Sequence, residues 1–531
     1  MDDVVAQRFD ECLRNLPSYL GQHVLISALA LGIGIAVSLP LAILGARSKT
    51  LRWPTLTAAS IIQTIPSMAL LALFYPVLVV VRWLVTSGIE AVTGEPAEPP
   101  FSALGFFPTV IALTLYSMLP ILRNTVTAIT GVDPAMTEAA RGLGMRPRQV
   151  LLKVELPLAS PVIIAGIRTA TVWVVGIATL STPVGQTSLG NYIFTGLQTL
   201  NWISVLFGCV CAAALAIVLD QLIGLAQSAA TRRSPGRALA AGLGLVAVIV
   251  GGLAPVVYRP EADYAIGAKT FTEQFVLASV VRGQLSDRGL DAEVREGLGS
   301  SVIFDALGAG EVDCYVDYSG TIWVNHMKRK DMADRETVLR EMTGWLEREH
   351  GIRCLGPLGF ENAYCLAMRR ERAEARGARA IGDLTRASPD LTIGGSYEFF
   401  GRPEWQQMKR AYGLRFQERK QYQSTFMYKA IQDGDVDVIA AFSSDGRIAA
   451  YDLVVLDDPK RVIPPYDAVL LVAPGRADDQ ALVEALRPLL GKVPVEAMRR
   501  ANHMVDRETN KATVDQAADW LRREIGLTQP V

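Results

Sequence analysis

The sequence predicts an all-α membrane domain of about six transmembrane helices, followed by an α/β domain of two lobes. Of the 531 residues, 50% are hydrophobic and only 20% are charged. The residues up to Val257 hold 15 Lys and Arg and 11 Asp and Glu, whereas the later residues hold 37 and 42. Long apolar stretches lie in the first half, and alternating strand and helix patterns lie in the second. One polypeptide therefore joins a membrane half to a water-soluble half.

Six apolar stretches of the first half are long enough to cross a hydrocarbon core of roughly 30 Å. They are residues 23–46, 56–81, 106–130, 160–182, 202–225 and 238–257. Residues 184–200 are rich in Gly, Thr and Asn and too polar to span, so we expect an external or re-entrant loop there. Residues 1–22 are acidic and lack an apolar core, so they do not resemble a signal peptide.

The cationic residues indicate how the spans are oriented, because cytoplasmic loops carry an excess of Lys and Arg. Basic clusters follow the first span, separate the third from the fourth, and separate the fifth from the sixth. The loop at 82–105 instead holds Glu90, Glu95 and Glu98 with a single arginine. The basic loops then share the cytoplasmic face, and the sixth span delivers the second half to the outside.

The loop between the third and fourth spans carries a motif with a specific spacing. Glu138–Ala140 is followed after three residues by Gly144 and, nine residues later, by Val154–Pro157. The small side chains allow a short helix and a tight turn to dock closely against another protein. The pattern resembles the coupling loop of ABC importer permeases, EAA-x3-G-x9-I-x-LP, with Val154 in place of Ile. The resemblance implies contact with an ATPase subunit through Glu138, Ala139, Ala140, Gly144, Leu156 and Pro157.

Two further stretches of the membrane half are similar to permeases that import osmoprotectants. Residues 62–70, IQTIPSMAL, resemble their second span, and residues 185–197 resemble their external loop. Packing of membrane helices through small residues is the alternative explanation for both stretches.

The second half alternates strands with helices from Asp263 onward, which predicts two α/β lobes with a ligand at the carboxyl ends of the strands. The expected strands are 264–267, 312–316, 391–395 and 436–440, and the expected helices include 335–349, 479–490 and one from Thr272. Hydroxyl, amide and aromatic side chains recur where these strands end.

Five segments at these turns resemble the substrate-binding domains of ABC importers for betaine, choline and carnitine. They are KTFTEQ at 269–274, YVDYSGT at 315–321, ENAY at 361–364, AFSSDGR at 441–447 and PPY at 464–466. The family commonly shows KTFTEQ, YPEYTGT, NxYxLA, YSTDGRI and PPY. The resemblance covers essentially the whole chain, because a permease fused to such a domain is a known arrangement.

This resemblance implies an ABC importer permease fold followed by a two-lobed, type II periplasmic-binding-protein-like domain. It also implies a cage for a quaternary ammonium group, which is too crowded to hydrogen-bond and is held by aromatic faces. The cage candidates, by matching position, are Tyr315, Tyr318, Tyr364, Phe442 and Tyr466. The candidates for polar contacts to a carboxylate or hydroxyl are Gln274, Thr270, Asn362 and Thr321.

The chain departs from the family pattern at three places. Val316 and Asp317 replace Pro-Glu, Phe442 replaces a common Tyr, and residues 328–350 are charged and offer no Tyr. The cargo within the class therefore stays open, and ergothioneine, a trimethylammonium betaine carried by related fused importers, is an alternative. Core packing is the alternative explanation for any single aromatic residue.

The expected domains follow from the spans and the resemblance. They are an extracytoplasmic N-terminal segment at 1–22, the permease domain at 23–230, the sixth helix and a linker at 231–260, and the substrate-binding domain at 261–531. Lobe 1 of that domain takes about 261–360 and 462–531, and lobe 2 takes about 361–461. We expect the chain in the bacterial cytoplasmic (inner) membrane, with the C-terminal domain extracytoplasmic, or periplasmic in a Gram-negative cell.

The chain contains no GxxxxGKS or GxxxxGKT loop to cradle phosphates, so ATP and Mg²⁺ belong to a separate ATPase. The family arrangement implies two ATPase copies, a homodimer of this chain, a small zwitterionic or cationic ligand and no nucleic acid. We expect no catalytic residues, no metal site and no cofactor bound by this chain, since its four His lack ligand spacing.

Two other classes of protein are alternatives to an importer. A membrane receptor that senses a solute without transporting it would not need the coupling motif, and a membrane enzyme would need a catalytic constellation that the sequence lacks. Six Cys make no disulfide framework in a chain this long, although Cys354 and Cys365 could pair.

Overall fold

The computed structural model describes residues 2–94, 101–199, 201–257, 262–329, 331, 333–507 and 510–527. These residues form two compact units, one built mainly from residues 9–257 and the other mainly from residues 262–527. Glu95 and Glu98, which we expect in an external loop, lie outside the described residues.

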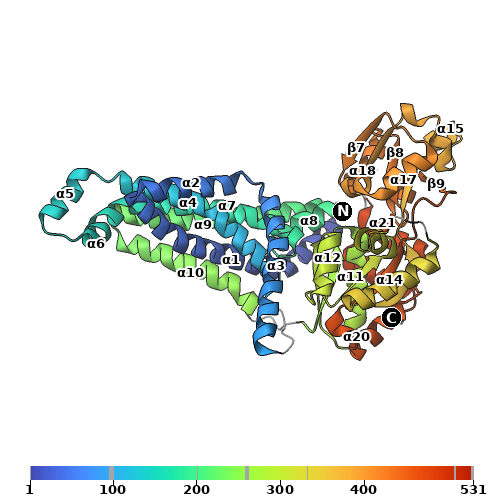
Figure 1. Cartoon of the computed structure of the whole chain (residues 1–531), viewed down its shortest axis with the longest axis horizontal. Helices are drawn as coiled ribbons and strands as arrows, with labels where there is room; N and C mark the ends of the chain where they lie inside the picture. The colour runs from blue at the N-terminus through green and yellow to red at the C-terminus, as the bar shows by residue number, and fades with distance from the viewer. Residues whose placement is uncertain are drawn as a thin grey trace. The chain divides into compact units, whose positions relative to one another are not determined.

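The membrane unit is helical, and its long helices α1, α4, α7, α9 and α10 run along one direction (Figure 1). The helices are α1 Asp2–Arg47, α2 Lys49–Thr64, α3 Ser67–Thr93, α4 Phe106–Thr130, α5 Pro134–Gly142, α6 Pro147–Val150, α7 Leu156–Ala178, α8 Gly190–Gln198, α9 Trp202–Arg232 and α10 Pro235–Val257. A π-helical turn, Leu151–Glu155, joins α6 to α7, and a 3-10 helix, Thr179–Val184, follows α7. Six helical segments of the described chain are long and apolar enough to cross a membrane, as predicted.

The structure corrects the predicted second span, 56–81, which is two helices. Helix α2 ends at Thr64 and α3 begins at Ser67, with Ile65 in an extended conformation between them. Pro66 explains the break, because proline disfavours helical backbone at the residue before it and lacks the N–H that a continuing helix needs. An apolar run shows that a segment is buried in lipid but does not show this interruption.

Two other membrane segments also differ from their predicted form. Residues 2–22, predicted as an N-terminal segment, form the first part of the continuous helix α1. The stretch at 184–200, expected to be a loop, contains helix α8. Short amphipathic helices of this kind are difficult to distinguish from polar loops by hydropathy alone.

The second unit contains two five-stranded sheets, in the orders β2-β1-β3-β10-β4 and β7-β6-β8-β5-β9. The strands are β1 Tyr264–Lys269, β2 Ala292–Leu298, β3 Cys314–Tyr318, β4 Arg353–Glu361, β5 Tyr364–Arg369, β6 Thr392–Ser396, β7 Glu418–Tyr422, β8 Val438–Phe442, β9 Leu453–Leu456 and β10 Asp467–Val472. The chain passes from the first sheet to the second after β4 and returns before β10. The predicted two-lobed α/β architecture is therefore confirmed.

Helices cover both sheets of this unit. They are α11 Thr272–Ser286, α12 Ser300–Gly308, α13 Ser319–Thr321, α14 Arg335–His350, α15 Arg370–Arg376, α16 Tyr397–Gly401, α17 Pro403–Tyr412, α18 Ser424–Asp433, α19 Arg447–Ala450, α20 Gln480–Leu486, α21 Val495–Asp506 and α22 Val514–Glu524. The four expected strands are present, although β3 and β8 each begin two residues later than predicted. Cys354 on β4 and Cys365 on β5 remain separate thiols.

A buried ion pair ties two neighbouring strands of the first sheet, β1 and β3, together. Lys269 at the end of β1 and Asp317 on β3 are 2% and 0% exposed, and the Lys269 ammonium contacts the Asp317 carboxylate. The Tyr315 hydroxyl donates to the same carboxylate at 2.5 Å. Removing one partner of a buried pair leaves an uncompensated charge, which costs about 3–5 kcal/mol.

We therefore expect Lys269→Met to destabilise this sheet by about 3 kcal/mol or more, because Asp317 would be left buried without its cation. Hydrogen–deuterium exchange of β1 and β3 in the full chain measures the local opening free energy. The control is Arg288→Met, which breaks an exposed pair with Glu484 and should change the opening free energy by about 1 kcal/mol or less. Equal protection in both variants would contradict a structural role for the buried pair.

Candidate functional site

The site lies where the chain crosses between the two sheets. The crossing residue Asn362 donates its backbone N–H to Tyr466 O at 3.0 Å, and Ser443 donates its own to Ala363 O at 2.8 Å. These bonds bring the end of β8 and the start of β10 beside the crossing after β4. The carboxyl ends of strands, where ligands bind in open α/β sheets, therefore meet at one place.

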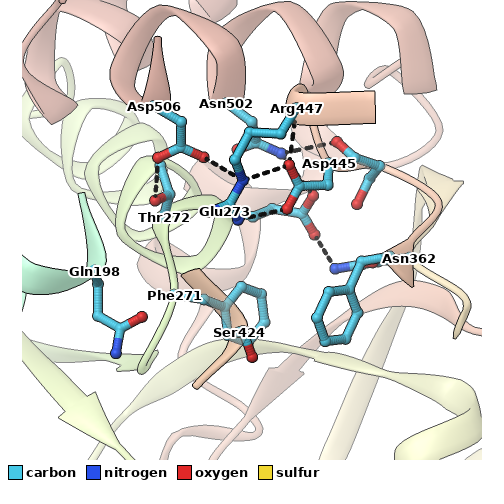
Figure 2. Close-up of a pocket in the computed structure, with 12 residues that line it drawn as sticks. Gln198, Phe271, Thr272, Glu273, Asn362, Ser424, Asp445, Arg447, Asn502 and Asp506 are labelled. Atoms are coloured by element: carbon cyan, nitrogen blue, oxygen red, sulfur yellow. Dashed lines mark hydrogen bonds and ion pairs between the residues drawn. The ribbon is translucent and has the colours of Figure 1, made fainter. Parts of the chain in front are cut away.

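Side chains from both lobes line a pocket at this position, as Figure 2 shows. They include Phe271, Thr272, Glu273, Asn502 and Asp506 from the first lobe, Asn362 from the crossing, and Ser424, Phe442, Ser444, Asp445 and Arg447 from the second lobe. Because both lobes contribute, a ligand held here would contact both at once.

Five aromatic rings form a continuous row beside this pocket, here called the aromatic row: Tyr318, Phe271, Phe442, Tyr364 and Tyr466. Phe271 stacks with Tyr318 at 6.1 Å between centroids and with Phe442 at 6.4 Å, almost parallel at 5°. Tyr364 lies 5.0 Å from Phe442 and 5.9 Å from Tyr466. Such a row presents several electron-rich ring faces within one small region.

One end of the aromatic row already holds a cation from the protein itself. The Arg402 guanidinium carbon lies 5.1 Å from the centroid of Tyr364 and 5.9 Å from that of Tyr466. Its Nη2 donates to Glu398 at 2.5 Å and its Nη1 to the Tyr466 hydroxyl at 3.0 Å, whereas Nε has no partner among the described residues. Both distances are within the range of cation–π attraction.

Hydrogen bonds to buried carboxylates hold two of these rings in place. The Tyr318 hydroxyl donates to Glu273 at 2.6 Å and accepts from Gln274 at 2.9 Å. The Tyr466 hydroxyl donates to Glu404 at 2.5 Å. The hydroxyl ends are thereby occupied, and the ring faces are what these side chains can offer to a ligand.

The structure brings together four of the five predicted cage residues, since Tyr318, Tyr364, Phe442 and Tyr466 all belong to the aromatic row. Tyr315 is fully buried and points to the other side of β3, where it binds Asp317. Side chains alternate between the faces of a strand, so Tyr315 and Tyr318 on β3 cannot share one. That alternation could have separated them from the sequence alone.

The four polar candidates occupy different environments. Asn362 lines the pocket and donates to Glu273 at 3.0 Å. Gln274 lies inside the first lobe, where it bonds Tyr318 and Val316 O. Thr321 is buried in α13, and Thr270 is exposed. Sequence reasoning missed Phe271, although it stands within the KTFTEQ segment, and Arg402, for which the sequence carried no distinguishing signal.

A cluster of buried ionisable groups forms one wall of the pocket. Arg447 donates to Asp445 through Nε at 2.9 Å and Nη2 at 2.6 Å, and its Nε lies 3.9 Å from Asp506. Burial raises the pKa of Glu273 above its ordinary value, although hydrogen bonds from its neighbours oppose the shift. Burial also raises the pKa of Asp506 to about 6, against the opposing effect of Arg447.

The predicted coupling loop folds as a short helix and a tight turn. Asp133 caps α5 by accepting the Ala135 N–H at 2.9 Å, and Gly144 adopts a left-handed φ of +81° that favours glycine. Met136 and Leu143 on this loop are 50% and 80% exposed. At the far end of the motif Glu155 is buried and contacts Arg47 at the end of α1. The loop therefore exposes apolar side chains, and its far end is held to α1 by this ion pair.

Two family models match the chain. The model described as the binding-protein-dependent transport system inner membrane component matches residues 38–232. The model described as the substrate binding domain of ABC-type glycine betaine transport systems matches residues 262–523.

Curated relatives match one or both halves. The ergothioneine transport permease and ergothioneine-binding protein of Helicobacter pylori (strain G27) is 28% identical over 492 residues, covering 89% of this chain and 83% of the relative. The choline transport system permease protein of Bacillus subtilis (strain 168) is 39% identical over 206 residues, covering 39% of this chain and 84% of the relative. The osmoprotectant import permease protein of Salmonella typhimurium (strain LT2) is 38% identical over 208 residues, with coverages of 39% and 88%.

The fold, the site and these matches together define a multi-pass membrane component of an ABC importer, with the permease and the substrate-binding domain on one polypeptide. This is a transport protein class rather than an enzyme class. The chain belongs to the osmoprotectant and ergothioneine family of ABC importers, which confirms the resemblance drawn from its motifs.

The raised pKa of Asp506 predicts a pH-dependent stability of the substrate-binding domain. A carboxyl that binds its proton more tightly when folded stabilises the fold fully below its ordinary pKa near 4, and this contribution is lost as the pH rises through about 6. The unfolding free energy should therefore fall between pH 4 and 7 by up to about 3 kcal/mol from this group.

Asp506→Asn should flatten that dependence, as measured by denaturant unfolding of the full chain at pH 4, 5, 6 and 7. The control Asp433→Asn alters a carboxylate that is 49% exposed and should keep the wild-type slope. Identical slopes for the Asp506 variant and the wild type would show that the carboxyl is ionised throughout this range.

Proposed function

We propose that this chain imports a quaternary ammonium compound of the betaine, choline or carnitine type, with its C-terminal domain as the receptor. The observation that carries the proposal is the aromatic row with the Arg402 guanidinium against two of its rings. A ring pair that accepts one weakly hydrated cation is suited to another, at roughly 0.5–2 kcal/mol per contact.

Within this proposal Tyr318, Tyr364, Phe442 and Tyr466 contact the cationic group, and Phe271 completes the row. A carboxylate on the cargo would accept from the Arg402 Nε, which lacks a partner among the described residues, and from Asn362. The other candidates, Tyr315, Gln274, Thr270 and Thr321, belong neither to the pocket lining nor to the aromatic row and would act by supporting the residues that do.

Ergothioneine is a second candidate cargo. The Helicobacter pylori relative, named for ergothioneine, matches this chain across both domains, whereas the named choline and osmoprotectant relatives match the permease half. Phe442 offers a ring without a hydroxyl where the family commonly has Tyr, which suits a larger and partly aromatic betaine. Ergothioneine, like glycine betaine and carnitine, carries a trimethylammonium group and a carboxylate, so the same row serves either candidate.

In the proposed transport cycle this chain works as a dimer with a separate ATPase. Two copies of this chain form the pathway, and each docks one copy of a separate ATPase, which supplies ATP and Mg²⁺, through the loop at 138–157. The basic loops face the cytoplasm and the domain at 261–531 lies outside, with lobe 1 at about 261–360 and 462–531 and lobe 2 at about 361–461. The exposed Met136 and Leu143 support docking by this loop. Closure of the lobes on cargo is a hinge motion at the crossings.

Calorimetry on the full chain with glycine betaine, choline, carnitine, proline betaine and ergothioneine tests the cargo class. Tyr364→Leu removes the ring between Phe442 and Tyr466 and should weaken binding about 3- to 30-fold, because a ring contact with a cation contributes roughly 0.5–2 kcal/mol. The control Phe416→Leu alters a ring outside the row and should bind as the wild type does. Heat with ergothioneine alone would select the second candidate, and no heat with any of the five would refute the proposal.

The contact between Arg47 and Glu155, which anchors the coupling loop, leads to a separate prediction. Arg47→Met leaves Glu155 buried without its cation, so the loop should shift and co-purification with the ATPase should fall several-fold while cargo binding is unchanged. Arg47→Met/Glu155→Leu removes both charges and should restore much of the co-purification. Lys49→Met, two residues further on, is the control. A chain that never co-purifies with an ATPase would favour a receptor over an importer.

A further inference from the structure

A charged pair joins two membrane-spanning helices at equal depth. Arg168 on α7 donates to Asp220 on α9 through two parallel bonds, Nε to Oδ1 and Nη2 to Oδ2, both 2.5 Å long. At 1.5 Å per residue, Arg168 lies about 18 Å from the start of α7, which follows a basic loop. Asp220 lies about 18 Å from the end of α9, which precedes another basic loop. The pair therefore lies within the apolar, membrane-spanning part of both helices.

The pair is not enclosed by its own protomer. The side chains of Arg168 and Asp220 are 37% and 22% exposed, although both helices are otherwise strongly apolar. Charged groups at this depth are costly against lipid and face a bundle interior or a water-filled cavity instead. The face that carries the pair is therefore expected to meet protein or a water-filled cavity rather than lipid.

The guanidinium also keeps N–H donors that Asp220 does not use. Gly224, one turn beyond Asp220, lies against the guanidinium, and a Cβ there would stand 3.4 Å from the Arg168 Cζ. Two of the five N–H donors of the guanidinium serve Asp220, and Asp220 Oδ2 also receives the Gln221 amide at 3.4 Å. A guanidinium with spare donors in fork geometry matches a second carboxylate.

We infer that Arg168 and Asp220 form a transient binding site for a zwitterion within the membrane pathway. The cargo carboxylate binds Arg168 while its quaternary ammonium group lies against Asp220. Because both cargo charges are close together on a short skeleton, the molecule can insert between the two side chains and exchange partners with them. Every charge stays paired during the exchange, so no isolated ion is left in a low-dielectric region. This inference rests on the proposed cargo class.

Replacing the pair would affect uptake differently if the pair only held α7 against α9. Apolar residues in place of an ion pair are often neutral or stabilising for structure. The double variant Arg168→Met/Asp220→Leu therefore keeps the helices packed if the pair is structural, and uptake should then stay within about two-fold of the wild type. If the pair binds cargo, the same variant should lose uptake of zwitterions about ten-fold or more.

The experiment measures initial uptake of radiolabelled glycine betaine, ergothioneine and choline into proteoliposomes that contain the full chain and its ATPase. Each variant is first checked for its thermal midpoint, for cargo binding by calorimetry and for basal ATP hydrolysis. The control Thr169→Val alters the next residue of α7, whose hydroxyl bonds its own helix at Ala165 O, and should transport normally. Cargo binding by the external domain should be unchanged in all variants.

A second variant, Arg168→Lys, keeps the positive charge and loses the fork, so it supports the test if the double variant does not fold. We expect it to slow the zwitterions about ten-fold and to spare choline, which has no carboxylate. Equal effects on zwitterions and choline, or wild-type uptake by the double variant, would overturn the inference. Absence of cargo binding in the wild type would instead refute the proposed function, so the two failures are distinguishable.

Discussion

Charge withdrawn from water has to be paired, and this requirement shapes both domains of the chain. Lys269 with Asp317 ties β1 to β3, and Arg447 holds the turn after β8 against α21 through Asp445 and Asp506. In the membrane domain the same requirement pairs the buried Glu155 with Arg47 at the end of α1. These pairs connect elements that are far apart in the sequence, so the positions of the binding residues depend on them.

The receptor site instead depends on a cation that is weakly hydrated. A guanidinium or a quaternary ammonium group loses little on leaving water and gains from a ring face. Arg402 between Tyr364 and Tyr466 is an internal example of the chemistry that the site offers to its cargo. The neighbouring carboxylates Glu398 and Glu404 offset its charge, so the other ring faces of the aromatic row are left for another cation.

Much of the architecture could be predicted from local pattern. Apolar length predicted six spans, and alternating strand and helix patterns predicted two lobes with a site at the strand ends. Prediction failed in the second span, where Pro66 interrupts the helix that the apolar composition indicates. It also missed partners that only the fold brings near, such as Arg402, which lies 38 residues from Tyr364 in the chain and 64 from Tyr466.

The sequence by itself determined that a membrane permease and an α/β receptor share one polypeptide, because hydropathy, charge density and motif spacing are properties of consecutive residues. Only the tertiary structure decided which side chains meet. Tyr315 and Tyr318 stand three residues apart on one strand and face opposite sides, whereas Tyr318 and Phe442 belong to one aromatic row from separate sheets. The physical reason is that a contact depends on strand register and on the crossing of the chain between lobes, which no local pattern encodes.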